Sequence, residues 1–276
     1  MAIHMTTVVG SHLTVFEHML QHYKDMGIDS LLINVQLDQY ESPLYCEIKA
    51  ITRRFRAEIV NVFVGKWLQS VNPYLYWHTL SQAPDDWFIL ADSDELQTYP
   101  GEIHSLISAL HSEGYDFLEG FVIDRVAKDG SFPPVRDDVS LWEQFPLAGL
   151  ITLPIIQGNA MKVAAAKGKV RLSWGQHYSH TGRGCPRDRY YIPVHHFKWT
   201  EGLIDRMKAR IDFYRSVSDG LWIESEKVLC HCANHGGRIN VADPSFMLRE
   251  SGVTCPHETE LKAVVLANES RMPRPC

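Results

Sequence analysis

The residues best suited to chemistry are three acids that follow one short apolar run. Trp87-Phe88-Ile89-Leu90-Ala91 leads directly into Asp92-Ser93-Asp94-Glu95. A wholly apolar run of this length is typical of a buried parallel strand, so Asp92 and Asp94 are expected at the carboxyl end of a strand. No basic residue adjoins these acids in sequence to neutralise them. Because Mg²⁺ and Mn²⁺ prefer oxygen ligands, the pattern predicts a divalent-cation site. A solvated turn with helix-capping aspartates is the alternative.

Short apolar runs alternate with helical patterns over the first 125 residues. Strands are expected at 3–9, 31–37, 59–64, 87–91 and 117–123, with helices between them. This alternation predicts an α/β fold with a mostly parallel central sheet and helices on both faces. Ligands bind beyond the carboxyl ends of such strands. The edge so defined carries Gly10, Ser11, Asp38, Lys66, Asp92, Ser93, Asp94, Asp124 and Arg125.

The rest of the chain is less regular. Residues 127–160 have the turn-rich composition of a binding or lid region. Residues 162–170 and 171–173 are expected to pair as a hairpin, 193–199 to form a last strand and 202–216 an amphipathic helix. The pattern weakens after residue 220. Neither a Gly-x-Gly-x-x-Gly nor a Gly-Lys-Ser/Thr loop is present, so a Rossmann site and a P-loop are not supported.

Composition restricts the class of partner. Apolar residues make up 45% and charged residues 22% of the 276, as in a globular protein, and the net charge of −6 argues against nucleic acid or an anionic membrane as partner. No run approaches a membrane span and no signal peptide is visible, so a cytoplasmic location is expected. The six cysteines are widely spread, which favours reduced thiols.

Two further clusters offer metal ligands. His195 and His196 end a second strand-like run, and because adjacent strand residues face opposite ways, at most one should point at a metal beside Asp92 and Asp94. A hydrogen-bonded structural histidine is the alternative. Residues 230–235 hold two cysteines and two histidines, with Cys255 and His257 downstream. Their spacing fits no standard zinc pattern, and a simple buried element is the alternative.

The motif Trp87-Phe88-Ile89-Leu90-Ala91-Asp92-Ser93-Asp94-Glu95 resembles the strand and Asp-x-Asp motif of GT-A fold glycosyltransferases, in particular family 2-like bacterial proteins related to family 92. Later segments resemble that family's motifs in the same order, across roughly residues 5 to 240. These segments are 17–23 with 27–29, 124–127, 141–147, 175–177 and 195–199. One departure is the Gly10-Ser11-His12 sequence, where the family usually has Lys-Asn-Glu.

The resemblance implies a three-layer GT-A domain over residues 1–220, with a C-terminal extension at 221–276. Residues 1–125 would be the nucleotide-binding half and 126–200 the acceptor-side half. The implied reaction moves a sugar from a UDP- or GDP-linked donor to a glycan or small-molecule acceptor, with inversion, using Mn²⁺ or Mg²⁺. A metal-dependent phosphohydrolase or nucleotidyltransferase, and a non-catalytic glycan- or nucleotide-binding scaffold, are the alternatives.

The resemblance also implies roles for individual residues. Asp94 would bind the cation that bridges the diphosphate, Asp92 would lie near the ribose or the cation, and His195 or His196 would complete the site. Lys66 or Arg125 would add to the clamp on the diphosphate, and an ordinary surface or salt-bridged residue is the alternative for each. His177 and Lys198 would also lie near the donor or acceptor. Asp124, or else Glu143, would deprotonate the acceptor hydroxyl, with Asp138 a further acid in this region. Trp142 and Trp174 would stack on a sugar ring or fill the core.

Overall fold

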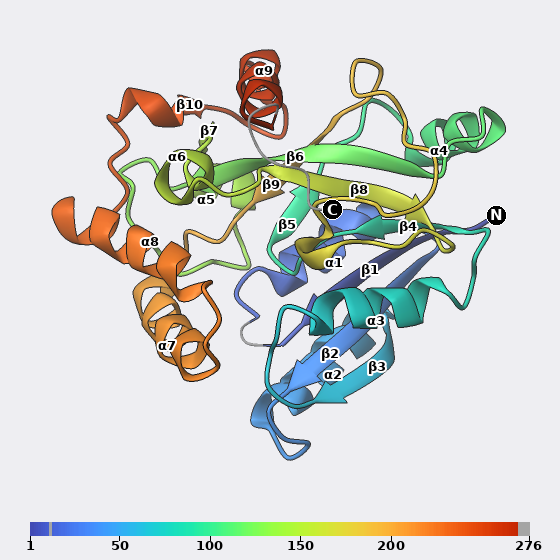
Figure 1. Cartoon of the computed structure of the whole chain (residues 1–276), viewed down its shortest axis with the longest axis horizontal. Helices are drawn as coiled ribbons and strands as arrows, with labels where there is room; N and C mark the ends of the chain where they lie inside the picture. Colours follow the sequence, from blue (N-terminus) through green and yellow to red (C-terminus); the bar gives the residue numbers. More distant parts are fainter. Residues whose placement is uncertain (11–12, 270–276) are drawn as a thin grey trace. The chain divides into compact units, whose positions relative to one another are not determined.

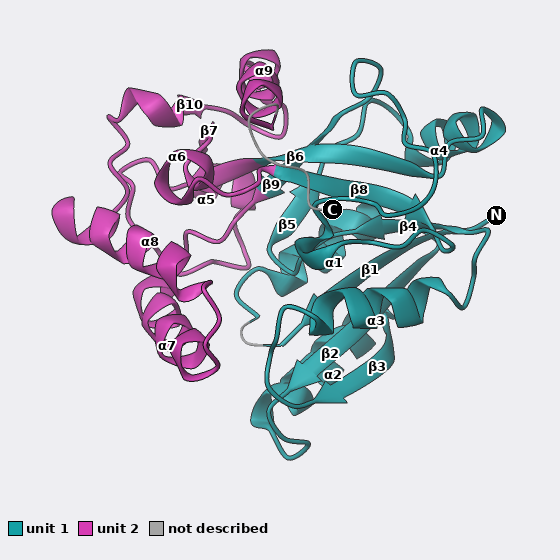
Figure 2. Ribbon diagram, viewed as in Figure 1, with its two compact units in different colours: residues 1–122, 161–195 teal, residues 123–160, 196–276 magenta. Residues whose placement is uncertain are grey.

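The computed structural model describes residues 1–10 and 13–269. These form two compact units (Figure 2). Unit 1 comprises residues 1–122 and 161–195, and unit 2 comprises residues 123–160 together with the chain from 196 onward. The units thus divide the chain at other points than the expected boundary at residue 220, and that boundary stays a prediction.

Unit 1 is built on a sheet with the strand order β6-β8-β4-β1-β2-β3 (Figure 1). The parallel strands are β1 (Ile3–Val9), β2 (Ser30–Leu37), β3 (Glu58–Val64) and β4 (Trp87–Leu90). Strand β8 (Met161–Lys167) runs antiparallel to both β4 and β6 (Phe117–Val126). The short strand β5 (Glu95–Gln97) pairs with β9 (Ile192–His196), which also pairs with β6.

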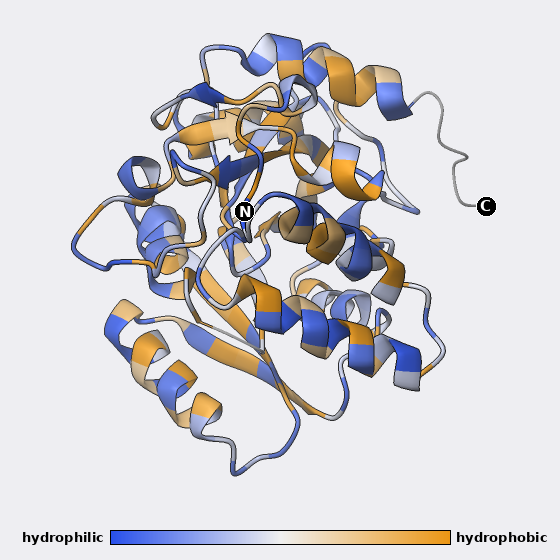
Figure 3. Cartoon of the chain, turned by 90° about the vertical axis from the view of Figure 1, so that its left-hand side faces the viewer, coloured by the Kyte–Doolittle hydropathy of each residue, from blue (hydrophilic) through white to orange (hydrophobic). Residues whose placement is uncertain are grey.

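Apolar side chains on both faces of the parallel strands explain why helices cover this sheet. Val8, Phe88 and Leu90 pack with Leu75 and Tyr76 of helix α3 (Val71–Leu80). Alternate residues on the opposite face are also fully buried, and helices α1 (Phe16–Asp25) and α2 (Pro43–Phe55) pack on β2. Figure 3 shows polar and apolar segments alternating along the helices, as expected of helices with one buried face. Helix α4 (Ile103–Ser112) and the 3₁₀ turn η1 (Trp174–Gln176) complete the regular elements of unit 1.

Unit 2 contains strands β7 (Leu147–Gly149) and β10 (Arg249–Glu250), which belong to the same ten-stranded sheet of the described residues, and it has a core of its own. The carboxyl-terminal part of β6 pairs antiparallel with β7, which pairs with β10. A core cluster includes Val126, Trp199, Leu203, Val228 and Phe246. The helical elements of this unit are α5 (Leu141–Gln144), α6 (Thr152–Ile156), α7 (Leu203–Ser216), α8 (Trp222–Asn234), η2 (Pro244–Phe246) and α9 (Glu258–Glu269).

The α/β class with a mostly parallel central sheet is confirmed, as are the five strands expected in the first 125 residues. The expected hairpin of 162–170 with 171–173 is wrong, because β8 pairs with β4 and β6, while Leu172 bridges to Ser179. Cys46, Cys185, Cys230, Cys232 and Cys255 are free thiols, in line with the expectation for these five. No helix within the described part of the chain is both long and apolar enough to cross a membrane.

Candidate functional site

The three acids after β4 form a tight turn that closes on itself. The backbone N–H of Glu95 donates to the carbonyl of Asp92 over 3.0 Å, and the Glu95 carboxylate accepts from the backbone N–H of Asp92 over 3.0 Å. Glu95 is buried, whereas Asp92, Ser93 and Asp94 are partly exposed. Glu95 therefore holds residues 92–95 in one conformation. These four residues are called the acid turn.

Lys162 of β8 supplies the positive charge that the local sequence lacks. Its Nζ lies 2.6 Å from Asp92 Oδ2 and 3.0 Å from Glu95 Oε1, and only 7% of its side chain is exposed. The antiparallel register pairs Ile89 with Ala165, so continuing it by three residues brings Lys162 opposite Asp92. Although burial opposes it, the attraction of the two carboxylates raises the pKa of Lys162 above its ordinary value. The lysine is therefore charged at neutral pH.

The turn η1 completes the environment of Asp92. Gln176 is buried and its Nε2 donates to Asp92 Oδ1 over 3.2 Å, so both oxygens of this carboxylate are engaged. Gly175 and Gln176 both adopt left-handed backbone conformations, with φ of 64° and 58°. A Cβ at Gly175 would lie 2.8 Å from His177 Nε2, so this position needs glycine for space as well as for φ.

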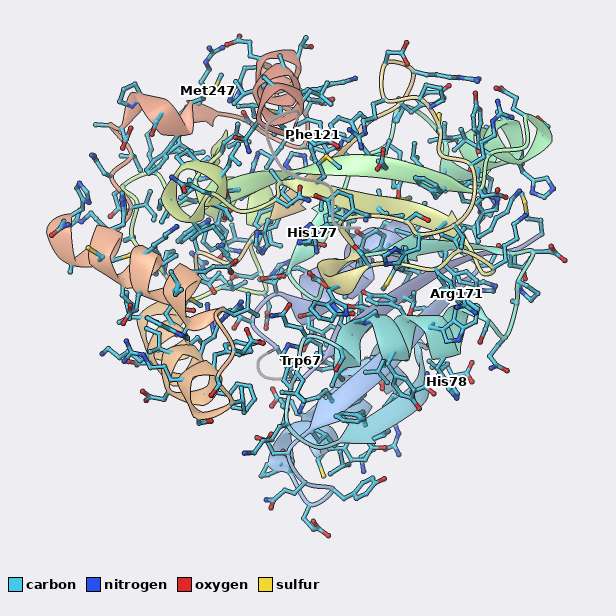
Figure 4. The ribbon with its side chains drawn as sticks, in the orientation of Figure 1. Trp67, His78, Phe121, Arg171, His177 and Met247 are labelled. Carbon is cyan, nitrogen blue, oxygen red and sulfur yellow. The ribbon has the colours of Figure 1, made fainter. Side chains whose placement is uncertain are left out.

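His177, labelled in Figure 4, follows η1 directly and is influenced by the charges of Lys162 and Asp92. Its Nδ1 is 2.6 Å from the carbonyl of Met161, and since a carbonyl only accepts, this nitrogen carries the proton. Burial, reinforced by the charge of Lys162, lowers the pKa of His177 to about 4. The ring is therefore neutral at pH 7, with Nε2 as its acceptor nitrogen. A histidine in this state accepts a hydrogen bond from a ligand hydroxyl or donates a lone pair to a cation.

Buried polar side chains support the acid turn from within unit 1. The hydroxyl of Tyr23 donates to the carbonyl of Glu95 and accepts from the backbone N–H of Gln97, over 3.2 and 3.1 Å. The Gln97 side chain donates to the carbonyl of Leu90 over 2.6 Å, and Tyr76 donates to that of Ala91 over 3.1 Å. Sequence reasoning missed Lys162, Gln176 and this support, because their partners lie far away along the chain.

Three other predicted residues follow their strands as expected. Gly10 comes directly after β1, Asp38 after β2, and Lys66 two residues after β3. Asp38 and Lys66 are exposed. A Cβ at Gly10 would lie 2.6 Å from Gln36 Oε1, so only glycine fits there without movement. Ser11 and His12 lie outside the described residues, and the predicted role of Ser11 is untested.

The metal ligands predicted from the sequence are Asp92, Asp94 and one of His195 and His196. Within residues 1–10 and 13–269, no three His, Cys, Asp or Glu side chains lie together so as to hold a metal ion, which covers both the Asp92–Asp94–histidine set and the Cys230–His257 region. His195 Nε2 is 3.5 Å from Thr98 Oγ1, whereas His196 Nδ1 is 3.6 Å from Asp124 Oδ1. A Mg²⁺ or Mn²⁺ that arrives with a diphosphate needs only one or two carboxylates from the protein. The partly exposed Asp94 could supply one such carboxylate. The bound cation stays a prediction.

Asp124, the first choice for the catalytic base, lies within β6 and not beyond its end, because the strand continues to Val126. It is 1% exposed and accepts from Thr152 N (2.6 Å), Thr152 Oγ1 (2.7 Å) and Trp199 Nε1 (3.0 Å). Burial raises its pKa, but the nearby imidazole of His196, the charge of Lys198 and the hydrogen bond from Thr152 N outweigh burial and lower it to about 2. A carboxylate so satisfied is a poor proton acceptor, and these contacts favour an anchoring role in unit 2.

Arg125 also lies within β6 and is fully buried. Its guanidinium donates to the carbonyls of Phe145, Ser251 and Gly252 over 2.8–3.1 Å and lies over the Trp142 ring at 5.0 Å. Burial lowers its pKa to about 10, so it remains charged at neutral pH. These contacts commit Arg125 to the packing of unit 2 and disfavour the predicted diphosphate clamp.

The remaining predicted residues lie in varied surroundings. Glu143 is exposed on α5, and Asp138 is exposed and pairs with Arg136 at 2.9 Å. Lys198 is partly buried, with its Nζ 4.7 Å from the Trp199 ring centre. Trp142 packs edge-on against Phe197 in unit 2, whereas Trp174 of η1 is 61% exposed. Of the two tryptophans, only Trp174 therefore offers most of its surface to a ligand.

No protein-family model matches the chain, and no curated protein matches it. Among solved structures, HddC from Yersinia pseudotuberculosis aligns with a TM-score of 0.33 and 11% identity, over 48% of this chain and 64% of that one. S. aureus TarS aligns with a TM-score of 0.39 and 9% identity, over 88% of this chain and 44% of that one. A third structure is a putative glucose-1-phosphate thymidylyltransferase from Bacillus anthracis in complex with a sucrose. It aligns with a TM-score of 0.33 and 11% identity, over 99% of this chain and 98% of that one. This chain spans less than two thirds of the length of the first two. Likenesses at these TM-scores do not place the chain in a family.

Proposed function

We propose that the chain is a glycosyltransferase that moves a sugar from a nucleotide-diphosphate donor to an acceptor, with a divalent cation held by Asp94. The observation that carries the proposal is the position of the acid turn. It follows β4 directly, at the edge where Gly10, Asp38 and Lys66 follow the parallel strands β1, β2 and β3. Parallel α/β sheets bind nucleotides at this edge, and the motif there resembles the Asp-x-Asp of GT-A enzymes.

The contacts of the acid turn suggest different roles for Asp92 and Asp94. Asp92 is engaged by Lys162 and Gln176, so its role is to fix the turn and contact the donor from there. Asp94 is the acid we assign to the cation that accompanies the diphosphate. When bound, such a cation offsets the negative charge that develops on the departing diphosphate. The exposed Lys66 and the neutral His177 are proposed to contact donor phosphate or hydroxyl groups.

The acceptor hydroxyl must lose a proton as it attacks the sugar carbon. Both oxygens of Asp124 already accept hydrogen bonds, and its pKa of about 2 makes it a weak base. We therefore assign this role to the exposed Glu143 ahead of Asp124. The test is replacement of each by its amide. Glu143→Gln should abolish sugar transfer and leave donor binding unchanged, whereas loss of transfer in Asp124→Asn alone would return the role to Asp124.

A thermal-shift screen of nucleotide diphosphates and nucleotide-sugars, with and without Mn²⁺, identifies the donor. A ligand at 100 times its dissociation constant stabilises the native state by about 2.7 kcal/mol. The expected result is a rise in Tm with one nucleotide class in the presence of Mn²⁺. Product analysis then separates the alternatives: a transferase releases the nucleoside diphosphate, a nucleotidyltransferase forms a nucleotide-sugar from a nucleoside triphosphate and a sugar phosphate, and a binding scaffold turns over neither. Absence of any nucleotide-dependent shift contradicts the proposal.

A further inference from the structure

The ammonium of Lys162 occupies the point between two carboxylates where a bound cation would otherwise be expected. Asp92 Oδ2 and Glu95 Oε1 lie 2.6 and 3.0 Å from Nζ. Hard divalent cations bind carboxylate oxygens at about 2.0–2.6 Å, so a small inward shift of both side chains would suit such a cation. The position is well enclosed, because 7% of the lysine side chain and 2% of the Glu95 side chain are exposed.

The rest of the acid turn is built around this ammonium. The second oxygen of Glu95 accepts from the backbone N–H of Asp92, and the second oxygen of Asp92 accepts from Gln176. In each of the two carboxylates, one oxygen thus accepts a hydrogen bond that orders the turn and the other pairs with Lys162. Without the lysine, two partly or fully buried carboxylates would share a small space without the charge of Lys162 between them, which is a costly arrangement unless a cation enters.

Strand β8 also contains a second buried lysine, Lys167, whose ion pairs differ from those of Lys162 in the ratio of lysines to acids. Lys167 has 9% of its side chain exposed and lies 3.2 Å from Asp116, a carboxylate that also pairs with Lys169 at 2.9 Å. There, two lysines surround one acid, so loss of Lys167 leaves the acid neutralised. At the acid turn one lysine serves two acids, and its loss leaves both without a counter-charge from it.

We propose that Lys162 is a built-in counter-ion that positions the acid turn and keeps divalent cations away from Asp92 and Glu95. The turn is then ordered before any ligand arrives, and a cation enters only through Asp94, together with the group that it bridges. The inference rests on the proposed function only for the identity of that group as a diphosphate. Its consequence for the metal alone is independent of any nucleotide.

The test is titration of Mn²⁺ alone, with unbound Mn²⁺ measured by its electron paramagnetic resonance signal. The variants are Lys162→Met, Lys162→Gln and Lys162→Arg, with Lys167→Met as the matched control on the same strand. Removal of the charge should create a two-carboxylate site, so Lys162→Met and Lys162→Gln should bind Mn²⁺ at least about tenfold more tightly than the wild type, a gain of about 1.4 kcal/mol. Lys162→Arg and Lys167→Met should bind as weakly as the wild type.

Either of two results would overturn the inference. One is a folded Lys162→Met or Lys162→Gln, as judged by circular dichroism, whose Mn²⁺ affinity equals that of the wild type. The other is a wild type that binds Mn²⁺ alone and loses this binding in Asp92→Asn, because a cation would then already lie at Asp92 in the presence of Lys162. This measurement applies even if neither Lys162 variant folds. If no nucleotide binds at all, the proposed function fails, whereas a gain of Mn²⁺ affinity in Lys162→Met still supports the counter-ion role.

Discussion

Lys162 Nζ lies 2.6 Å from Asp92 Oδ2, and this ion pair joins two residues that are 70 positions apart in the chain. In sequence, the acids after β4 have no basic neighbour, which is why they predict a cation site. In the structure, the neighbouring antiparallel strand brings a lysine to Asp92 and Glu95. Lys162 therefore already offsets the negative charge of Asp92 and Glu95. The hypothesis of a bound cation consequently depends on Asp94.

Replacement of Gly175 by alanine tests how closely η1 is fitted to the site. The backbone there has a φ of 64°, and the new Cβ would lie 2.8 Å from His177 Nε2. Gly175→Ala should lower the free energy of unfolding by about 1–2 kcal/mol and displace Gln176 or His177. Gly220→Ala is the control, because nothing lies within 4 Å of its Cβ position and its φ is not positive. Equal urea-unfolding midpoints for the two variants would contradict the account.

A buried polar network fixes the strands that lead to the site. Asn34 Oδ1 accepts from Asn61 Nδ2 and Thr79 Oγ1 over 2.7 and 2.8 Å, and its Nδ2 donates to Thr6 Oγ1 over 3.1 Å. Asn34→Ala would leave buried partners unsatisfied, at a cost of about 2 kcal/mol in unfolding free energy. The exposed Gln39→Ala should change it by less than about 0.5 kcal/mol. Chemical denaturation measures both, and a neutral Asn34→Ala would show that the network is dispensable.

Asp124 should make stability depend on pH in the acid range. Its folded-state pKa of about 2 lies below the ordinary 3.8, so its ionised form stabilises the folded state above pH 3.8. That contribution, about 2 kcal/mol, is lost as pH falls from 3.8 through 2. The stability difference between the wild type and Asp124→Asn should therefore be largest at pH 5 and shrink towards pH 2. The exposed Asp205→Asn serves as control, and a difference that does not vary with pH would refute this role.

Trp142 and Trp174 should respond differently to truncation. Trp142 packs against Phe197 and under the Arg125 guanidinium, so Trp142→Ala should lower the free energy of unfolding by about 2 kcal/mol or more. Trp174 is 61% exposed, so Trp174→Ala should change it by less than about 0.5 kcal/mol. If Trp174 stacks on a sugar, its loss should raise the KM for the acceptor. A large fall in Tm for Trp174→Ala would instead indicate a packing role.

The sequence predicted the elements whose signals are local. Apolar runs bounded by turn residues defined β1 to β4 and the residues that follow them, including Gly10, Asp38 and Asp94. It could not predict that β8 lies between β4 and β6, since strand order depends on pairing between segments distant in sequence. For the same reason Lys162, Gln176 and the buried partners of Asp124 and Arg125 were invisible. The sequence marks Lys162 only as one of two lysines in an otherwise apolar strand, and Gln176 only as part of a Gly-Gln-His segment.

The most direct test of the central claim is calorimetric titration of the chain with UDP and with GDP, each with and without Mn²⁺. The variants are Asp94→Asn and, as the matched control, the exposed Asp138→Asn. The account predicts that the wild type and Asp138→Asn bind one of these nucleotides only when Mn²⁺ is present, and that Asp94→Asn loses this binding by at least about 1.4 kcal/mol, or tenfold. Nucleotide binding that needs no Mn²⁺, or that survives unchanged in Asp94→Asn, would contradict it.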